Sequence, residues 1–214
     1  MINLRTLDRM AGLTFKNAIR LHFDSISLFT QESYASAYFI SVLSLEEHGK
    51  VFWIEDLLWH SRVDGRMGLE WEEKWLQEIL KHSSKQRIFG HNFQIDLPKW
   101  YLDKISNGAL ELEKQNAMYV GLPKTGRKLN LNGKIIDPLK FTQRKARRQI
   151  TILNDALLER TLGKIKGTSE YDSKSVSDLI DREFFNKLLE RWKYISARTQ
   201  RRLRKLEGLE DSID

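Results

Sequence analysis

Two glutamates and a lysine interrupt an apolar stretch of the chain, LSLEEHGKVFW at residues 43–53. If residues 34–60 form a helix with about 100° between successive residues, Glu46, Glu47 and Lys50 all fall among apolar side chains. Isolated buried charges are unfavourable by several kcal/mol, so these groups need partners. Lys50 follows Glu46 by four residues and Glu47 by three, so it can form an ion pair with either glutamate. One negative charge then remains, and we expect another helix to supply its donor.

The same predicted helix has one polar sector, which we expect to face solvent. Polar side chains grouped on one side of an otherwise apolar helix are typical of an exposed face. The sector consists of Ala37, Ser41, Ser44, His48 and Glu55. The pattern therefore predicts that His48 points outward while the three charges point inward.

A second predicted helix, over residues 69–93, carries the expected partners. His82 and Gln86 lie within its aromatic stripe, and Lys85 lies at the edge of that stripe. Gly49 indicates close approach of another backbone, because a glycine in mid-helix costs up to ~1 kcal/mol relative to alanine. The predicted network consists of Glu46, Glu47, Lys50, His82 and Lys85. Such a network can fix helix packing without chemistry, or it can form a functional site, and the pattern alone leaves both interpretations open.

Apolar periodicity at three- and four-residue steps predicts helices over most of the chain. The expected helices span residues 6–30, 33–62, 69–93, 98–120, 137–162 and about 174–206. Residues 121–137 contain glycine, proline and an Asn-Gly pair, which predict a loop with a small β-hairpin. We therefore expect an all-α fold, an antiparallel bundle of about six helices in a single domain over residues 1–214, with a basic C-terminal helix.

Composition excludes several classes of protein. The chain has no cysteine, so it has no disulfide framework and no thiolate metal site, as is typical of a reducing cytosol. The N-terminus shows no export signal. The longest charge-free run in the apolar region, residues 33–45, is shorter than the ~20 residues that span a bilayer. A cytoplasmic protein without a membrane partner is expected.

Positive charge is concentrated in the C-terminal part of the chain. The formal net charge is +7, and residues 120–205 contain 22 Lys and Arg against 9 Asp and Glu, whereas the rest contains 14 against 20. This asymmetry indicates an anionic partner, with RNA the leading candidate. The candidate RNA-binding residues, in KFTQRKARR and RTQRRLRK, are Lys140, Arg144, Lys145, Arg147, Arg148, Arg198, Arg201 and Arg202.

Three segments in order carry a resemblance to a known family: YASAYFISVLSLEEHGKVFW at 34–53, HSSKQ at 82–86 and KQNAMYVG at 114–121. They resemble the AbiV family of bacterial abortive-infection proteins over about residues 5–160. The family pattern is an alanine-rich helix with EE-x-GK, an H-x-x-K on the next helix, and YV before a glycine-containing loop. The resemblance implies a HEPN-like helical domain that acts in phage defence, and many such domains are metal-independent ribonucleases that work as dimers. Carried over by position, the candidate catalytic residues are Glu46, Glu47, Lys50, His82, Lys85 and Tyr119.

The sequence departs from the usual HEPN nuclease signature, in which four to six residues separate an arginine from a histidine. Arg87 and His91 have only three residues between them. Lys85 and His91 have five, but an ammonium cannot hold a phosphate with the two parallel hydrogen bonds of a guanidinium.

The sequence leaves three hypotheses for function. In a metal-independent endoribonuclease or RNA-directed toxin without cofactor, His82 deprotonates the ribose 2′-hydroxyl, Lys85 and Lys50 stabilise the phosphorane, and Glu46 or Glu47 orients them. Alternatively, the chain is a non-catalytic module that binds a phage or host protein to block translation or phage development. A metal-dependent phosphodiesterase is disfavoured, because adjacent glutamates diverge by about 100° on a helix and no H-x-x-x-H or D-x-D motif accompanies them.

Overall fold

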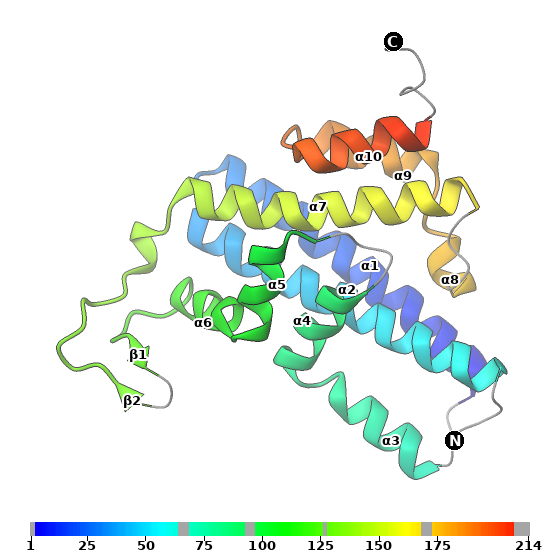
Figure 1. Ribbon diagram of the computed structural model, residues 1–214, viewed down its shortest axis with the longest axis horizontal. Coiled ribbons are helices and arrows are strands. Elements are labelled where there is room, and N and C mark those ends of the chain that lie inside the picture. Colours follow the sequence, from blue (N-terminus) through cyan, green and yellow to red (C-terminus); the bar gives the residue numbers. More distant parts are fainter. Residues whose placement is uncertain (1–2, 64–68, 93–96, 126–127, 168–172, 208–214) are drawn as a thin grey trace.

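The computed structural model describes residues 3–63, 69–92, 97–125, 128–167 and 173–207 (Figure 1). These residues are mostly helical, which confirms the all-α bundle. The elements are α1 (Leu4–Thr30), α2 (Tyr34–Val63), α3 (Leu69–Glu78), α4 (His82–His91), α5 (Lys99–Ser106), α6 (Ala109–Asn116), β1 (Lys124–Thr125), β2 (Lys128–Leu129), the 3-10 helix η1 (Pro138–Lys140), α7 (Gln143–Ile165), α8 (Lys174–Ser177), α9 (Arg182–Arg191) and α10 (Ala197–Glu207).

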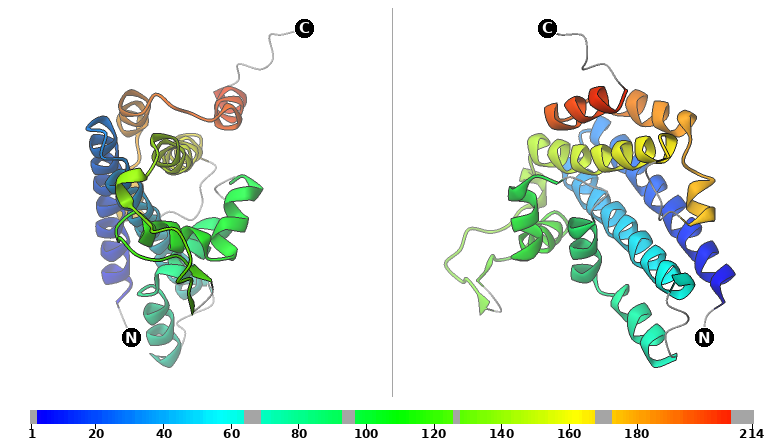
Figure 2. Two further views of the ribbon diagram at one scale, coloured as in Figure 1. Left: turned by 90° about the vertical axis from the view of Figure 1, so that its left-hand side faces the viewer. Right: turned by 45° about the vertical axis from the view of Figure 1, so that its right-hand side comes forward.

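The two longest helices, α1 and α2, form an antiparallel hairpin through the middle of the molecule (Figure 1). The turn between them places Glu32 at a φ of 61°, in the left-handed region. Helix α7 lies across this hairpin, α9 packs against both α7 and α1, and α10 lies against α7 (Figure 2). Helix α4 packs on α2, with α5 and α6 beside it.

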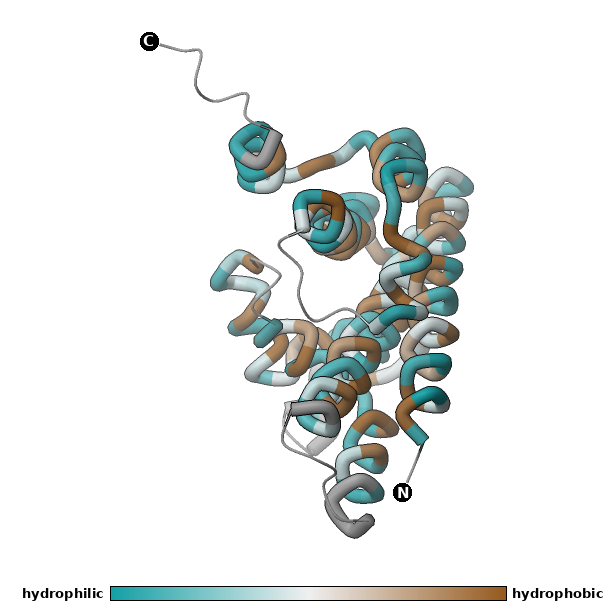
Figure 3. Tube along the Cα trace, turned by 90° about the vertical axis from the view of Figure 1, so that its right-hand side faces the viewer, coloured by the Kyte–Doolittle hydropathy of each residue, from teal (hydrophilic) through white to brown (hydrophobic). Residues whose placement is uncertain are grey.

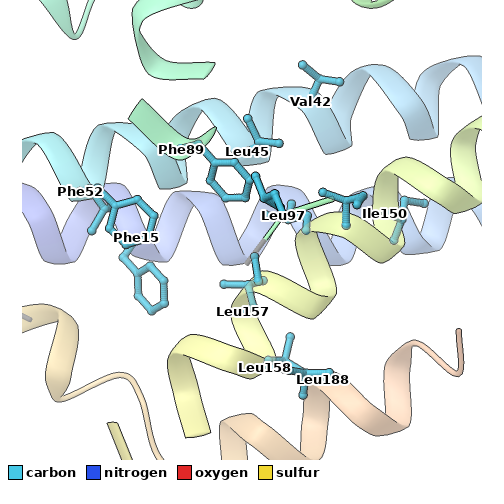
Figure 4. Packing of buried hydrophobic residues seen from close by; sticks show 14 of the residues in the cluster. Phe15, Val42, Leu45, Phe52, Phe89, Leu97, Ile150, Leu157, Leu158 and Leu188 are labelled. Atoms are coloured by element: carbon cyan, nitrogen blue, oxygen red, sulfur yellow. The ribbon is translucent and has the colours of Figure 1, made fainter. Parts of the chain in front are cut away.

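Apolar side chains from α1, α2, α4 and α7 meet in one core (Figure 4). Phe15 of α1, Leu45 of α2, Phe89 of α4 and Leu157 of α7 are all buried there. Figure 3 shows apolar residues concentrated where helices face one another, whereas α10 is mostly hydrophilic. The core therefore holds α4, which begins at His82, in a fixed place on α2.

The polar sector of α2 is buried, and the prediction that it faces solvent is wrong. Helices α1 and α7 cover it, and the hydroxyl of Ser44 donates a hydrogen bond of 2.6 Å to the carbonyl of Ala18. Small side chains on this side of α2 allow neighbouring helices to approach closely, which explains why the sector is less apolar than the rest without contacting water. The buried residues are Ala37, Ser41, Ser44, His48 and Glu55.

A buried ion pair accounts for the charged end of this sector. Arg160 of α7 is fully buried and donates from Nη2 to both carboxylate oxygens of Glu55, at 2.8 and 2.7 Å, and from Nη1 to Nε2 of His48 at 3.1 Å. Burial, together with the charge of Arg160, lowers the pKa of His48 well below its ordinary value, so this imidazole stays neutral and can accept. Glu55 also accepts from the backbone N–H of Ser173 at 3.0 Å, which ties the start of α8 to α2.

Three of the predicted helices are divided. Residues 69–93 form α3 and α4, separated at Lys81, which is extended with φ −83° and ψ 124°. Residues 98–120 form α5 and α6, separated at Gly108, whose φ of 76° favours glycine. The predicted basic helix over 174–206 is three helices, because the chain is extended at Asp181 and Trp192. The helices on both sides of each break pack against the same core, so the apolar periodicity continues across the break. The sequence pattern therefore does not reveal where one helix ends and the next begins.

The predicted β-hairpin is present as a short antiparallel pair of β1 and β2, with Lys124 opposite Leu129. A separate turn contains the Asn-Gly pair, where the N–H of Gly133 donates to the carbonyl of Asn130 at 3.0 Å. Asp137 caps the 3-10 helix η1 rather than a long helix, and α7 begins after Thr142, whose hydroxyl accepts from the N–H of Lys145.

Candidate active site

Glu46 is the centre of a buried polar cluster between α2, α4 and α6. Its carboxylate is 1% exposed and accepts three hydrogen bonds: from Nδ1 of His82 at 2.5 Å, from Nε2 of Gln86 at 2.7 Å and from Nζ of Lys114 at 2.8 Å. Three donors, one of them an ammonium, compensate the loss of hydration of this carboxylate. The expected partners from another helix are therefore present, and two of them come from α4.

Lys114, from α6, supplies the positive charge that the cluster needs. Its Nζ lies 2.8 Å from Glu46 and 2.7 Å from Glu111, and its side chain is 5% exposed. Gln86 donates to Glu111 as well, at 2.9 Å. Burial acts to raise the pKa of Glu111, but hydrogen bonds from Lys114 and Gln115 outweigh it and hold this pKa below its ordinary value. Lys114 thus forms ion pairs with two carboxylates that belong to different helices.

His82 combines a buried anchor with an exposed ring. It is the first residue of α4, and its side chain is 54% exposed although its Nδ1 contacts the buried Glu46. When Nδ1 donates to a carboxylate, the neutral ring keeps its lone pair on Nε2. Glu46 therefore fixes the orientation of a histidine that can exchange protons with a molecule in solvent.

Lys50 does not pair with either glutamate, and that prediction is wrong. Glu47 is half-buried, points about 100° away from Glu46 around α2, and accepts from Nδ2 of Asn17 in α1 at 3.1 Å. Within the described part of the chain, neither Lys50 nor Lys85 forms a side-chain hydrogen bond or ion pair, although Lys85 is only 8% exposed. Lys50 follows Glu46 by four residues on α2 and Lys85 follows His82 by three residues on α4, so each lysine is about one helical turn from a member of the Glu46–His82 pair.

Tyr119 does not join the cluster. Its ring is 66% exposed beyond the end of α6, and its backbone N–H donates to the carbonyl of Gln115. Met118 and Val120 beside it are exposed as well. The structure thus places Tyr119 on the surface, on the same segment as Lys114 but outside the Glu46 cluster.

Four of the eight predicted RNA-binding residues lie around one cavity of about 530 Å³. These are Arg144, Arg147, Arg148 and Arg198, which come from α7 and from the start of α10. The other four lie outside it: Lys140 is 3.6 Å from Asp137, Lys145 is 3.7 Å from Glu113, Arg202 donates to Glu159 at 2.7 Å, and Arg201 is exposed. The two basic segments, with 49 residues between them in the sequence, thus meet in space.

Sequence reasoning placed Gln86 on the inward stripe but left it out of the predicted network, and it missed Lys114 and Glu111 altogether. A signal for Lys114 exists. Leu110, Lys114 and Ala117 recur at four- and three-residue steps and are all buried, so the lysine sits on the apolar face of α6. A lysine on an apolar helix face needs a carboxylate partner, just as Glu46 needs a donor. Among the described residues, no three His, Asp or Glu side chains gather in a way that could hold a metal ion.

None of the described helices combines the length and apolar character that crossing a bilayer requires. Comparison with curated proteins and with solved structures finds no significant match. The family model for AbiV-type HEPN domains matches residues 6–159, a span that contains Glu46, His82 and Lys114. The chain therefore belongs to the AbiV family of HEPN domains, which are abortive-infection proteins of phage defence.

Proposed function

We propose that this protein is an RNA-directed toxin, a metal-independent endoribonuclease that shuts down infected cells. One observation carries the proposal: the buried carboxylate of Glu46 accepts from Nδ1 of His82 at 2.5 Å, while the His82 ring stays 54% exposed. A carboxylate that holds one ring nitrogen and leaves the other toward solvent is the arrangement of a general base. A histidine that only fixed helix packing would not need an exposed ring.

The proposed reaction uses this geometry. Nε2 of His82 removes the proton of a ribose 2′-hydroxyl, and the 2′-oxygen attacks the adjacent phosphorus. The P–O5′ bond breaks, a 2′,3′-cyclic phosphate forms, and the 5′-oxygen leaves with a proton from water. The hydroxide that remains takes the proton from His82 and restores the neutral ring. Lys50 and Lys85, whose charges are not neutralised by any described residue, stabilise the phosphorane as its negative charge develops. The exposed ring of Tyr119 is proposed to stack on a base of the bound RNA.

The basic residues of α7 and α10 support RNA as the substrate. Arg144, Arg147 and Arg148 form no ion pair with any described residue, so their charges are available to phosphates. A homodimer, as the resemblance to HEPN nucleases implies, is part of the proposal.

A second candidate function rests on exposed apolar side chains between α6 and α7. Val120, Leu131, Ile135 and Leu139 are all more than 60% exposed along one connecting segment. Such a segment suits contact with another protein. In this alternative the chain is a non-catalytic module that binds a phage or host protein, and the Glu46 cluster only fixes the bundle.

Expression in bacteria separates the two functions. We expect the wild type to arrest growth and fragment total RNA, and His82→Ala to do neither while retaining the wild-type circular dichroism spectrum. His91→Ala is the matched control, because His91 is exposed on the same helix and the hydrogen bond of its Nδ1 within the described residues is with the carbonyl of Arg87. Purified wild type should cleave RNA in EDTA about 10²- to 10⁴-fold faster than His82→Ala. Equal cleavage by both proteins would exclude His82 as the base, and growth arrest with intact RNA would favour the protein-binding module.

A further inference from the structure

The cavity of about 530 Å³ is lined by residues within the family match and by residues beyond its C-terminal end. One wall is α7, a second is the segment that leads into α5, and the third is the start of α10 with Ser196 before it. Its volume falls within the ~300–1,000 Å³ typical of sites for small molecules. The α10 wall lies beyond residue 159, so AbiV membership does not account for this cavity.

Its rim carries guanidinium groups and a flat surface. Arg144, Arg147 and Arg148 recur at three- and one-residue steps on α7 and thus lie on the side of α7 that lines the cavity, and Arg198 of α10 lines it too. The guanidinium carbon of Arg148 lies 3.5 Å from the ring centroid of Trp100. Stacked guanidinium and indole planes form a platform for another planar group, and guanidinium forks bind phosphate oxygens in pairs.

The inner wall carries an acceptor without a donor. Asp155 is 7% exposed; its Oδ2 accepts from the backbone N–H of Ser196 at 3.3 Å, whereas its Oδ1 is buried and has no hydrogen-bond partner among the described residues. A buried polar atom left without a partner costs free energy that a bound donor would recover. Burial also raises the pKa of Asp155 to about 6, which accords with a carboxyl shielded from water.

We propose that this cavity binds one nucleotide. The phosphate contacts Arg144 and Arg147, the base stacks on the Arg148–Trp100 platform, and an N–H of the base donates to Oδ1 of Asp155. An anion alone would use the arginines but neither the platform nor the buried acceptor, and an acidic peptide would be repelled by Asp155. The nucleotide is either free or the 5′-terminal nucleotide of an RNA, since both present a phosphate next to one base. This inference does not rest on His82 being a catalytic base.

Isothermal titration calorimetry with the 214-residue chain tests whether the cavity binds a nucleotide. His82→Ala protein is used throughout so that RNA probes stay intact, and the ligands are the four nucleoside 5′-monophosphates, ribose 5-phosphate and inorganic phosphate. We expect saturable binding of at least one nucleotide, about tenfold or more tighter than ribose 5-phosphate. Asp155→Asn should remove most of that difference and leave the affinity for ribose 5-phosphate unchanged. Arg144 is exposed, so we expect Arg144→Gln to leave the fold intact. This substitution should lower the affinity for nucleotides and for ribose 5-phosphate alike by about tenfold.

Arg182→Gln on α9 is the matched control and should bind like the parent, because Arg182 does not line the cavity. Competition by a tetranucleotide with a 5′-phosphate, but not by its 5′-hydroxyl form, identifies an RNA end as the source; competition by monophosphates alone identifies free nucleotides. The inference is overturned if no nucleotide binds saturably, if ribose 5-phosphate or inorganic phosphate binds as tightly as the nucleotides, or if neither Asp155→Asn nor Arg144→Gln changes nucleotide binding.

Discussion

Gly49 of α2 lies against the backbone carbonyl of Lys85 in α4, so closely that a Cβ on residue 49 would be 2.1 Å from that oxygen. This contact brings the start of α4 onto α2, and it places His82 within hydrogen-bond distance of Glu46. The glycine is therefore required by the distance between two helices, as the mid-helix position of Gly49 predicted.

Gly49→Ala is expected to destabilise the protein by about 1–3 kcal/mol, because the added methyl group meets backbone rather than a movable side chain. Urea unfolding followed by circular dichroism measures the change. Gly121→Ala is the control, since a Cβ there meets no atom within 4 Å, and it should change the free energy of unfolding by less than about 1 kcal/mol. If the two variants are equally stable, the close contact is not a constraint on the fold.

Glu46→Gln tests the centre of the cluster. The amide retains the shape of the side chain but loses the charge that pairs with Lys114 and the acceptor that orients His82. Because Lys114 keeps its ion pair with Glu111, we expect a loss of about 1–3 kcal/mol in the free energy of unfolding rather than the larger loss of an unpaired buried charge. If His82 is the base, RNA cleavage should fall by ~10²–10⁴-fold.

Glu47→Gln is the matched control for Glu46→Gln. Glu47 is half-buried and contacts Asn17 rather than His82 or Lys114. We expect it to change stability by less than about 1 kcal/mol and to leave RNA cleavage at the wild-type level. If the two substitutions changed stability and RNA cleavage equally, contact with His82 would not be the cause of the effect of Glu46→Gln.

The difference between Glu46 and Glu47 shows which parts of the site can be predicted from the sequence. Helical geometry predicted that Glu46 and Glu47 point in different directions and that Glu46 needs a partner from another helix, and His82 is that partner. It could not predict that Lys114 rather than Lys50 neutralises the carboxylate, because Lys114 reaches Glu46 from 68 residues away along the chain. Short-range spacing describes one helix, whereas the choice between cations depends on how three helices pack.

The same limit explains the polar sector of α2. Periodicity separates one side of a helix from the others, but it does not say whether water or another helix covers that side. His48 is fully buried because α1 and α7 cover the sector and Arg160 occupies it. Burial of a charged side chain from α7 was not visible in the pattern of α2.

Arg160→Leu should be among the most destabilising substitutions in the chain. It leaves the buried carboxylate of Glu55 without its two guanidinium hydrogen bonds, and we expect a loss of about 3–5 kcal/mol. Combining it with Glu55→Leu should recover part of that loss, because no buried charge then remains. A double-mutant cycle by chemical denaturation measures the coupling, and additive effects of the two changes would contradict a direct ion pair.

Two carboxyl groups near α10, Asp155 and Glu159, should make a contribution to stability that falls as pH rises from about 5 to 8. Burial raises the pKa of Glu159 to about 7 despite the opposing pull of Arg202, and burial raises that of Asp155 to about 6. Both pKa values lie above those of the unfolded chain, so between about pH 4 and 7 the folded protein holds more protons, and its free energy of unfolding decreases as pH increases. Glu159→Gln removes the carboxyl group that binds one of these protons. The free energy of unfolding of wild type, measured relative to that of Glu159→Gln, should therefore fall by roughly 1–3 kcal/mol between about pH 4 and 7.

Two buried histidines contribute in the opposite direction: burial lowers the pKa of His22 to about 4 and that of His48 well below its ordinary value. Comparing each variant with wild type at every pH cancels these contributions, because both proteins contain both histidines. Asp155→Asn provides a second arm, because the charge of Asp155 adds to the rise in the pKa of Glu159. Without the charge of Asp155, the pKa of Glu159 should lie closer to its ordinary value. The pH dependence of stability in Asp155→Asn should therefore be weaker than the loss of the Asp155 carboxyl alone would make it. A difference between wild type and Glu159→Gln that stays constant from pH 5 to 8 would show that Glu159 is ionised throughout, with Arg202 outweighing its burial.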